Sequence, residues 1–195
     1  NAVYAAMVKS LDESVGRVLA HLRARGLEQN TLVAFASDNG GYIGVDKKSG
    51  QTAPVTSNAP LRSGKGSCYE GGIRVPLIIR WPGKVPAGRV NNEIVHIVDL
   101  YTTLARVDGV DIPKDRPIDG VDQLDFFLGK QEHSNRDGFP AYVANRLSAV
   151  KWRNWKAHLI WQENMYDTPQ HLPLPKLINL LTDPKEERDV AAKNT

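Results

Sequence analysis

Two short segments carry the side chains best suited to chemistry. The first, residues 35–41, reads FASDNGG and ends an apolar run on an acid, an amide and two glycines. Asp38 and Asn39 offer one anionic and one neutral oxygen, the kind of ligand that Ca²⁺ and Mg²⁺ prefer. The same residues are also favourable in turns, so this segment alone leaves a turn and a metal site as alternatives.

The second segment, residues 59–72, reads APLRSGKGSCYEGG and sets Lys65 between two glycines. A lysine ammonium there can supply a point charge to an anionic oxygen, although a solvated loop lysine explains the pattern equally well. A nucleotide-phosphate loop would need other residues where Ala59 and Gly66 stand, and a dinucleotide fingerprint would need glycine in place of Tyr69. Both nucleotide motifs are therefore excluded.

The first segment follows a predicted strand. Residues 31–37 form an apolar run without polar alternation, which is typical of an interior strand covered on both faces. A helix is predicted before it over 3–25, ending at a left-handed Gly26. The apolar residues expected to form one buried stripe of this helix are Met7, Leu11, Val15, Val18, Leu19 and Leu22. A helix leading into a buried strand indicates an α/β fold, in which ligands bind beyond the carboxyl ends of strands, where Asp38 and Asn39 stand.

Further core elements are predicted downstream. Residues 40–59 are rich in small polar residues and proline and indicate a long loop, and residues 73–83 give a second apolar strand closed by a Pro-Gly turn. Residues 95–109 indicate a strand end running into a helix that Asp99 caps. The residues expected to face inward from that helix are Leu100, Leu104 and Val107. A short apolar segment follows over 124–128.

The composition changes after about Gly129. Alternating and aromatic β-type segments there predict a small, mostly antiparallel subdomain. The chain then ends in a charged tail after Pro184, which we expect to be a solvated surface.

Composition indicates a soluble globular protein. The 195 residues are 41% hydrophobic and 24% charged, and the net charge of +3 is spread without long runs of one sign. Nucleic acid and anionic membranes would require a concentrated basic patch, so neither is an expected partner. No apolar segment approaches the ~20 residues that span a bilayer. A single cysteine, Cys68, excludes an internal disulfide. Because the sequence begins inside a helical pattern, without a secretory signal, we expect a fragment of a longer protein.

Together these segments resemble one family. SDNGG, NAPLRSGKGSCYEGGIRVPLIIRWPG, VHIVDLYTTLARVDGV and IDGVD are similar in order and spacing to the C-terminal half of an arylsulfatase-type sulfatase. The resemblance implies part of an alkaline-phosphatase-like α/β sandwich. It assigns residues 1–130 to the C-terminal part of that core, with the metal and sulfate loops, and residues 131–195 to the antiparallel subdomain and its tail.

The resemblance also implies an activity, the hydrolysis of sulfate esters of small molecules or sugars. It implies that Asp38 and Asn39 bind Ca²⁺ or Mg²⁺ and that Lys65 contacts the sulfate. The family's nucleophile is a formylglycine made within a Cys/Ser-x-Pro-Ser/Ala-Arg motif. No such motif occurs here, and Cys68 is followed by Tyr-Glu-Gly-Gly. We therefore expect the nucleophile upstream, in a missing N-terminal half, and we expect this fragment alone to be inactive.

Other functions remain open at this point. A phosphonate or phosphodiester hydrolase of the same superfamily shares the metal site and much of this half. A non-catalytic, degenerate relative is a further alternative. The family leads us to expect a periplasmic or secreted protein.

Other side chains admit a functional and a structural interpretation. Arg62 and Tyr69 flank Lys65, so they line the pocket or pack the loop, and Arg62 is a candidate for substrate binding. Glu70 suits a cap or a salt bridge rather than a base. His96 lies in an apolar run and is expected to be a core histidine.

The C-terminal subdomain is expected to help form the wall of the cleft, as it does in the family. Arg146 and Lys151 are therefore candidates for the substrate entrance. The three tryptophans Trp152, Trp155 and Trp161 lie in strand-like surroundings, so we expect core packing rather than sugar stacking.

Overall fold

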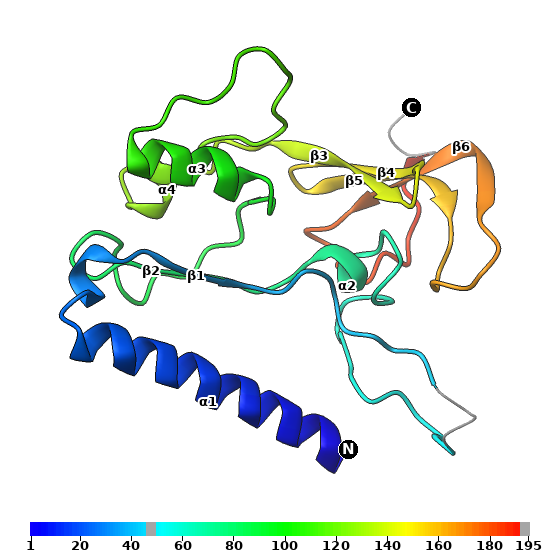
Figure 1. The fold of residues 1–195 in the computed structure, drawn as a ribbon. Coiled ribbons are helices and arrows are strands. Elements are labelled where there is room, and N and C mark those ends of the chain that lie inside the picture. The colour runs from blue at the N-terminus through cyan, green and yellow to red at the C-terminus, as the bar shows by residue number, and fades with distance from the viewer. Residues whose placement is uncertain (46–49, 192–195) are drawn as a thin grey trace.

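The computed structural model describes residues 1–45 and 50–191. Figure 1 shows a two-stranded sheet with a long helix on one side and two shorter helices on the other. In chain order the elements are α1 (Ala2–Ala24), η1 (Glu28–Asn30), β1 (Val33–Ala36), α2 (Glu70–Ile73), β2 (Leu77–Arg80), α3 (Asp99–Asp108), α4 (Leu124–Phe127), β3 (Gly138–Val143), β4 (Arg146–Trp152), β5 (Trp155–Trp161) and β6 (Gln170–Asn179). No helix in this described part is long and apolar enough to cross a membrane.

Helix α1 confirms the predicted helix to within a residue at each end. The Asn1 side chain caps its start by accepting a hydrogen bond from the Tyr4 N–H at 3.1 Å. Gly26 follows its end with φ +66°, the left-handed conformation predicted for it. The predicted burial is wrong, because no residue of α1 is buried and Leu11 is 52% exposed. Within the described residues the predicted stripe is only partly covered, since Val15, Leu19 and Leu22 are half-buried while Met7, Leu11 and Val18 are exposed.

Strands β1 and β2 pair antiparallel, with Val33 opposite Arg80 and Ala36 opposite Leu77. Both strands were predicted, and the turn after β2 contains Gly83 at φ +75°. The cover expected on both faces of residues 31–37 is wrong for the described residues, since Ala34 is exposed. Strand β1 leads directly to Asp38.

Helix α3 was predicted, but its environment differs. No strand precedes it over 91–97. Asp99 is its first helical residue rather than its cap, and the Asp99 carboxylate accepts hydrogen bonds from the N–H groups of His96 and Val121, both at 2.8 Å. The buried residues of α3 are Asp99, Thr102 and Thr103. Leu104, predicted to face inward, is 40% exposed because the helix turns its polar side toward these partners.

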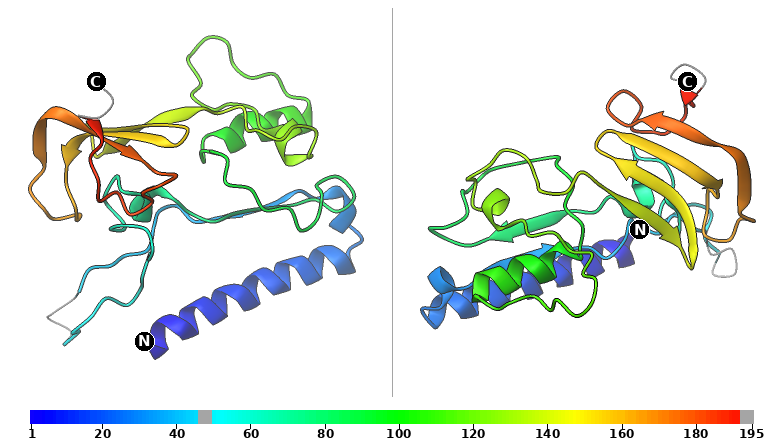
Figure 2. Two further views of the ribbon diagram at one scale, coloured as in Figure 1. Left: turned by 180° about the vertical axis from the view of Figure 1, so that it is seen from behind. Right: turned by 90° about the horizontal axis from the view of Figure 1, so that it is seen from above.

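The remaining strands form a four-stranded antiparallel sheet in the order β3-β4-β5-β6. Figures 1 and 2 show it beside the two-stranded sheet, with α2 beneath it. A small apolar cluster of Cys68, Ala141 and Ala149 packs between the 59–72 segment and this sheet. These strands confirm the predicted change to antiparallel structure, while the domain division at residue 130 stays a prediction.

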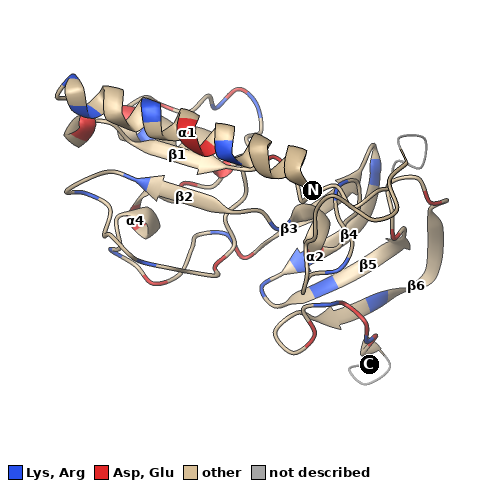
Figure 3. Cartoon of the chain, turned by 90° about the horizontal axis from the view of Figure 1, so that it is seen from below, with Lys and Arg blue, Asp and Glu red and all other residues tan. Residues whose placement is uncertain are grey.

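Other sequence expectations fall on loops. The described parts of the predicted loop, 40–45 and 50–59, contain no helix or strand, and residues 46–49 lie outside the described residues. Lys and Arg occur on helices, strands and loops, whereas Asp and Glu lie on the helices and loops and on none of the strands β1–β6 (Figure 3).

Candidate functional site

The backbones of the two chemistry-bearing segments are hydrogen-bonded to each other. The Gly40 N–H donates to the Gly72 carbonyl at 2.9 Å, and the Lys65 N–H donates to the Gly41 carbonyl at 3.2 Å. Asn58 reinforces this junction, because its side chain donates to the Gly41 carbonyl and accepts from the Gly41 N–H. The turn that follows β1 and the lysine loop therefore form one unit.

This junction explains the glycines in both segments. A Cβ at Gly40 would lie 1.8 Å from the Gly71 carbonyl oxygen, and a Cβ at Gly64 would lie 2.3 Å from the Gly41 carbonyl oxygen. Neither distance is possible for a real side chain. The glycines therefore permit the close backbone approach that joins the Asp38–Asn39 turn to the Lys65 loop.

The predicted metal ligands border an open crevice. Asp38 is exposed and Asn39 is half-buried, and both line a crevice of about 1830 Å³ together with Gly66 and Ser67. Lys65 is exposed in the loop beside them. The structure thus joins the backbones of the two segments, while convergence of the three side chains on one ligand stays a prediction.

The donor set fits part of a divalent-cation site. Asp38 and Asn39 supply oxygen donors from adjacent residues at the end of a strand, the chemistry that Ca²⁺ and Mg²⁺ prefer. Among the described residues, no group of three or more His, Cys, Asp and Glu side chains could hold a metal ion.

Arg62 makes its contacts with the C-terminal sheet and the tail. Its Nε lies 3.0 Å from a Glu163 carboxylate oxygen, and its guanidinium lies 4.8 Å from the Tyr69 ring centre and 5.0 Å from that of Trp161. Tyr69 is buried, and burial raises the pKa of its hydroxyl. These contacts support the packing interpretation of both residues, and substrate binding by Arg62 stays a prediction.

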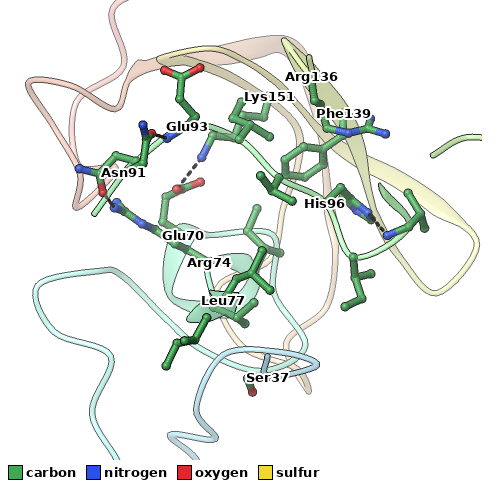
Figure 4. A pocket seen from close by; sticks show the side chains of 18 of the residues that line it. Ser37, Glu70, Arg74, Leu77, Asn91, Glu93, His96, Arg136, Phe139 and Lys151 are labelled. Atoms are coloured by element: carbon green, nitrogen blue, oxygen red, sulfur yellow. Dashed lines mark hydrogen bonds and ion pairs between the residues drawn. The ribbon is translucent and has the colours of Figure 1, made fainter. Parts of the chain in front are cut away.

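Glu70 is a salt-bridging residue, as its position suggested. It is 2% exposed, and its carboxylate lies 2.8 Å from the Lys151 ammonium and 3.1 Å from that of Lys156. Burial alone would raise the pKa of Glu70, but the two ammonium groups outweigh burial and hold that pKa below its usual value. Figure 4 shows Glu70 and Lys151 joined in this way at the crevice wall.

Sequence reasoning missed the other members of this charged cluster. Lys156 and His158 are buried on β5, and Glu186, in the supposedly solvated tail, is fully buried. The Glu186 carboxylate contacts both of them, so the prediction of a solvated tail is wrong at this residue. A signal existed, since Lys156, His158 and Ile160 share one face of the strand by alternation, but charged residues on a strand usually indicate the solvent side.

His96, the three tryptophans and Arg146 are the remaining candidates from the sequence, and their burial differs. His96 is half-buried, its ring lies edge-on to Phe139 at 5.1 Å, and burial lowers its pKa, which suits a core histidine. Trp152 is 54% exposed, so its predicted core packing is wrong, while Trp155 and Trp161 are half-buried. Arg146, the first residue of β4, is half-buried, and its place at a substrate entrance stays a prediction.

Comparison with known proteins identifies relatives of the whole chain. The family model described as "Sulfatase" matches residues 2–110, and the one described as "N-sulphoglucosamine sulphohydrolase, C-terminal" matches residues 64–194. Steryl-sulfatase of Mus musculus is 38% identical over 173 residues, which cover 89% of this chain and 27% of that protein. N-acetylgalactosamine-6-sulfatase of Rattus norvegicus is 35% identical over 205 residues, covering 94% of this chain and 38% of that protein. The chain thus spans well under half the length of these two curated relatives.

Solved structures match the fold as well. The PsFucS1 sulfatase from Pseudoalteromonas sp. superposes with a TM-score of 0.80 at 33% identity, over 94% of this chain and 37% of that one. Ps i-CgsB in complex with k-i-k-neocarrahexaose gives 0.76 at 31% identity, over 98% and 39%. These superpositions confirm the predicted fold class, part of an alkaline-phosphatase-like α/β fold with an antiparallel C-terminal sheet.

Proposed function

Because this chain belongs to the sulfatase family, we propose that it is the C-terminal part of an enzyme that hydrolyses sulfate esters. One structural observation supports the assignment of the site. The Asp38–Asn39 turn and the Lys65 loop are tied by the Gly40–Gly72 and Lys65–Gly41 backbone hydrogen bonds. This supports a shared role for a pair of oxygen ligands and an ammonium group.

In the proposed site, Asp38 and Asn39 supply two oxygen ligands to a Ca²⁺ or Mg²⁺ ion. Lys65 directs its ammonium to a sulfate oxygen of the substrate. A bound ion would stabilise the negative charge on the sulfate oxygens, and this charge redistributes most as the S–O bond breaks. The formylglycine nucleophile comes from outside these 195 residues, because the motif in which it forms is absent from the sequence. The family resemblance implies that the remaining metal ligands also lie upstream.

The substrate class is a sulfate ester whose organic part is a sugar or another small alcohol. Similarity to an N-acetylgalactosamine-6-sulfatase and to a structure in complex with neocarrahexaose supports a sugar. Similarity to a steryl-sulfatase supports a small alcohol. In this proposal, Asp38, Asn39 and Lys65 recognise the sulfate end of the substrate. Loops outside this chain help to select the organic part.

The test is an assay of the full-length protein that carries this chain, produced with the machinery that makes formylglycine. We expect hydrolysis of p-nitrophenyl sulfate or of a sugar sulfate, and its loss in a chelator. Lys65→Ala should lower kcat/KM by roughly 10²–10³, as when one preorganised donor to a developing charge is removed. Lys114→Ala, a change of another exposed loop lysine, should leave it unaltered. The 195-residue chain alone should give no turnover.

The same assay separates the alternatives. Family matches favour sulfate esters over phosphonates or phosphodiesters. Faster hydrolysis of bis-p-nitrophenyl phosphate than of every sulfate ester tested would reverse that preference. A full-length protein that hydrolyses neither class would favour the non-catalytic alternative.

A further inference from the structure

A buried cluster of charged side chains lies behind the Lys65 loop. Its members come from α2, β4, β5 and the segment after β6, which are far apart in the sequence. They are Glu70, Lys151, Lys156, His158 and Glu186. Glu70, Lys156, His158 and Glu186 are between 0% and 2% exposed. Burial this complete is rare for charged groups and requires close pairing.

The pairing is continuous through the cluster. The Lys156 ammonium lies 3.1 Å from a carboxylate oxygen of Glu70 and 3.1 Å from one of Glu186. The Lys151 ammonium lies 2.8 Å from the other oxygen of Glu70, and His158 Nε2 lies 2.7 Å from Glu186. Two carboxylates thus face two ammonium groups, which leaves neither lysine unpaired.

Glu186 holds both ends of the lysine loop. Its carboxylate accepts a hydrogen bond from the Glu70 N–H at 2.5 Å, and its own carbonyl accepts one from the Arg62 guanidinium at 2.9 Å. Arg62 and Glu70 bracket Lys65. A single tail residue therefore fixes the start and the end of the segment that presents Lys65.

The loop needs such external support. Its turn contains Gly64 and Gly66, and Gly66 adopts φ +86°, so the backbone on each side of Lys65 has little intrinsic stiffness. The same loop is hydrogen-bonded to the Asp38–Asn39 turn through Gly41. A shift of the loop that loosens these hydrogen bonds would move the ammonium relative to both candidate metal ligands, and misplacement by about 1 Å can cost 10²-fold in rate.

We propose that Glu186, in the C-terminal tail, is a positioning residue for Lys65. The inference rests on the proposed function for the part that concerns substrate. Within the structure it states that the tail completes the lysine loop. Glu186 acts through Lys65 and does not itself contact the sulfate ester.

The kinetic test is a double-mutant cycle in the full-length protein, because coupled residues give non-additive effects. Glu186→Gln should lower kcat/KM at least about tenfold. In a Lys65→Ala background the same change should alter kcat/KM by less than about twofold. Glu187→Gln, a change of the exposed neighbouring acid, should have no effect in either background. Equal losses from Glu186→Gln in both backgrounds would overturn the proposal and leave Glu186 a general stabilising residue.

A second measurement needs no activity. Hydrogen exchange of the full-length protein should show about tenfold less protection of the Lys65 and Gly40 amides in Glu186→Gln, and none of that loss in Glu187→Gln. Unchanged protection at these amides would overturn the proposal. If the wild-type protein hydrolyses no sulfate ester, the proposed function fails while this exchange result still decides the positioning role.

A milder variant covers the case in which Glu186→Gln does not fold. His158→Phe keeps an aromatic ring beside Tyr69 and leaves both lysines paired, but it removes the imidazole partner of Glu186. The proposal expects a smaller loss of protection at the same two amides. Protection equal to wild type in a folded His158→Phe protein would count against it.

Discussion

Arg136 and Asp99 form a bidentate ion pair in the interior. Arg136 Nε lies 3.0 and 2.9 Å from the two carboxylate oxygens of Asp99. The Asp99 side chain is fully buried and that of Arg136 is 10% exposed. Because Asp99 begins α3 and Arg136 precedes β3, this pair ties the helical part of the chain to the antiparallel sheet.

Breaking this pair should be costly. Arg136→Gln leaves the Asp99 carboxylate buried without its cation, and we expect the free energy of unfolding to fall by about 3–5 kcal/mol. Arg153→Gln is the matched control, because the pair of Arg153 with Asp137 is exposed and should contribute less than about 1 kcal/mol. Urea unfolding of the two variants measures both values. Equal losses of unfolding free energy in the two variants would show that the buried pair stabilises the fold no more than the exposed pair does.

Stability should depend on pH through Glu70. Lys156 and Lys151 hold the pKa of Glu70 below its ordinary value of 4.5 despite burial. A carboxyl whose pKa is depressed on folding adds stability above its unfolded pKa and loses it as pH falls through its folded pKa. The gap in unfolding free energy between wild type and Glu70→Gln should therefore be constant above about pH 5.5 and narrow below about pH 4.5.

Urea unfolding of both proteins between about pH 3 and pH 7 tests this sign. Glu187→Gln serves as the control, since Glu187 is exposed and its gap from wild type should not change with pH in the same way. A gap between wild type and Glu70→Gln that widens on acidification would refute the prediction.

Local sequence signals predicted α1, β1, β2, α3 and the antiparallel C-terminal strands, and the two segments that they singled out are hydrogen-bonded to each other. Apolar spacing and Gly26 defined α1, and the apolar run before Asp38 defined β1. The same signals failed where partners distant in sequence decide the outcome. α3 turns its polar side inward because Asp99 needs Arg136, and no spacing rule near Asp99 reveals an arginine that far downstream.

Glu186 shows the same limit more sharply. It lies in the charged run DPKEERD, which resembles a solvated tail, and its burial depends on Lys156 and His158 of a strand formed earlier in the chain. α1 shows the opposite failure, since its amphipathic pattern correctly predicted a helix but not what covers it. Periodicity predicts which face of a helix is apolar, but the element that packs against that face is known only from the tertiary structure.

The glycine junction between the two segments gives a steric prediction. Gly40→Ala would bring a Cβ within 1.8 Å of the Gly71 carbonyl oxygen, so the turn must separate from the loop. We expect a loss of about 1–3 kcal/mol in unfolding free energy. Gly16→Ala is the control, since open space surrounds Gly16 in α1 and alanine should stabilise that helix by about 0.5–1 kcal/mol. Thermal or urea unfolding of this chain compares them. A Gly40→Ala protein as stable as wild type would show that the junction is not tight.

The metal assignment predicts a ligand-dependent stability in the full-length protein. An ion that binds only the folded state at 100 times its dissociation constant adds about 2.7 kcal/mol, so millimolar Ca²⁺ or Mg²⁺ should raise the Tm by several degrees. Asp38→Ala removes the anionic ligand and should abolish most of that shift. Asp12→Ala, on the exposed surface of α1, should retain it. A Tm that rises equally with added cation in both variants would place the metal elsewhere, because a site that uses Asp38 cannot survive loss of its carboxylate unchanged.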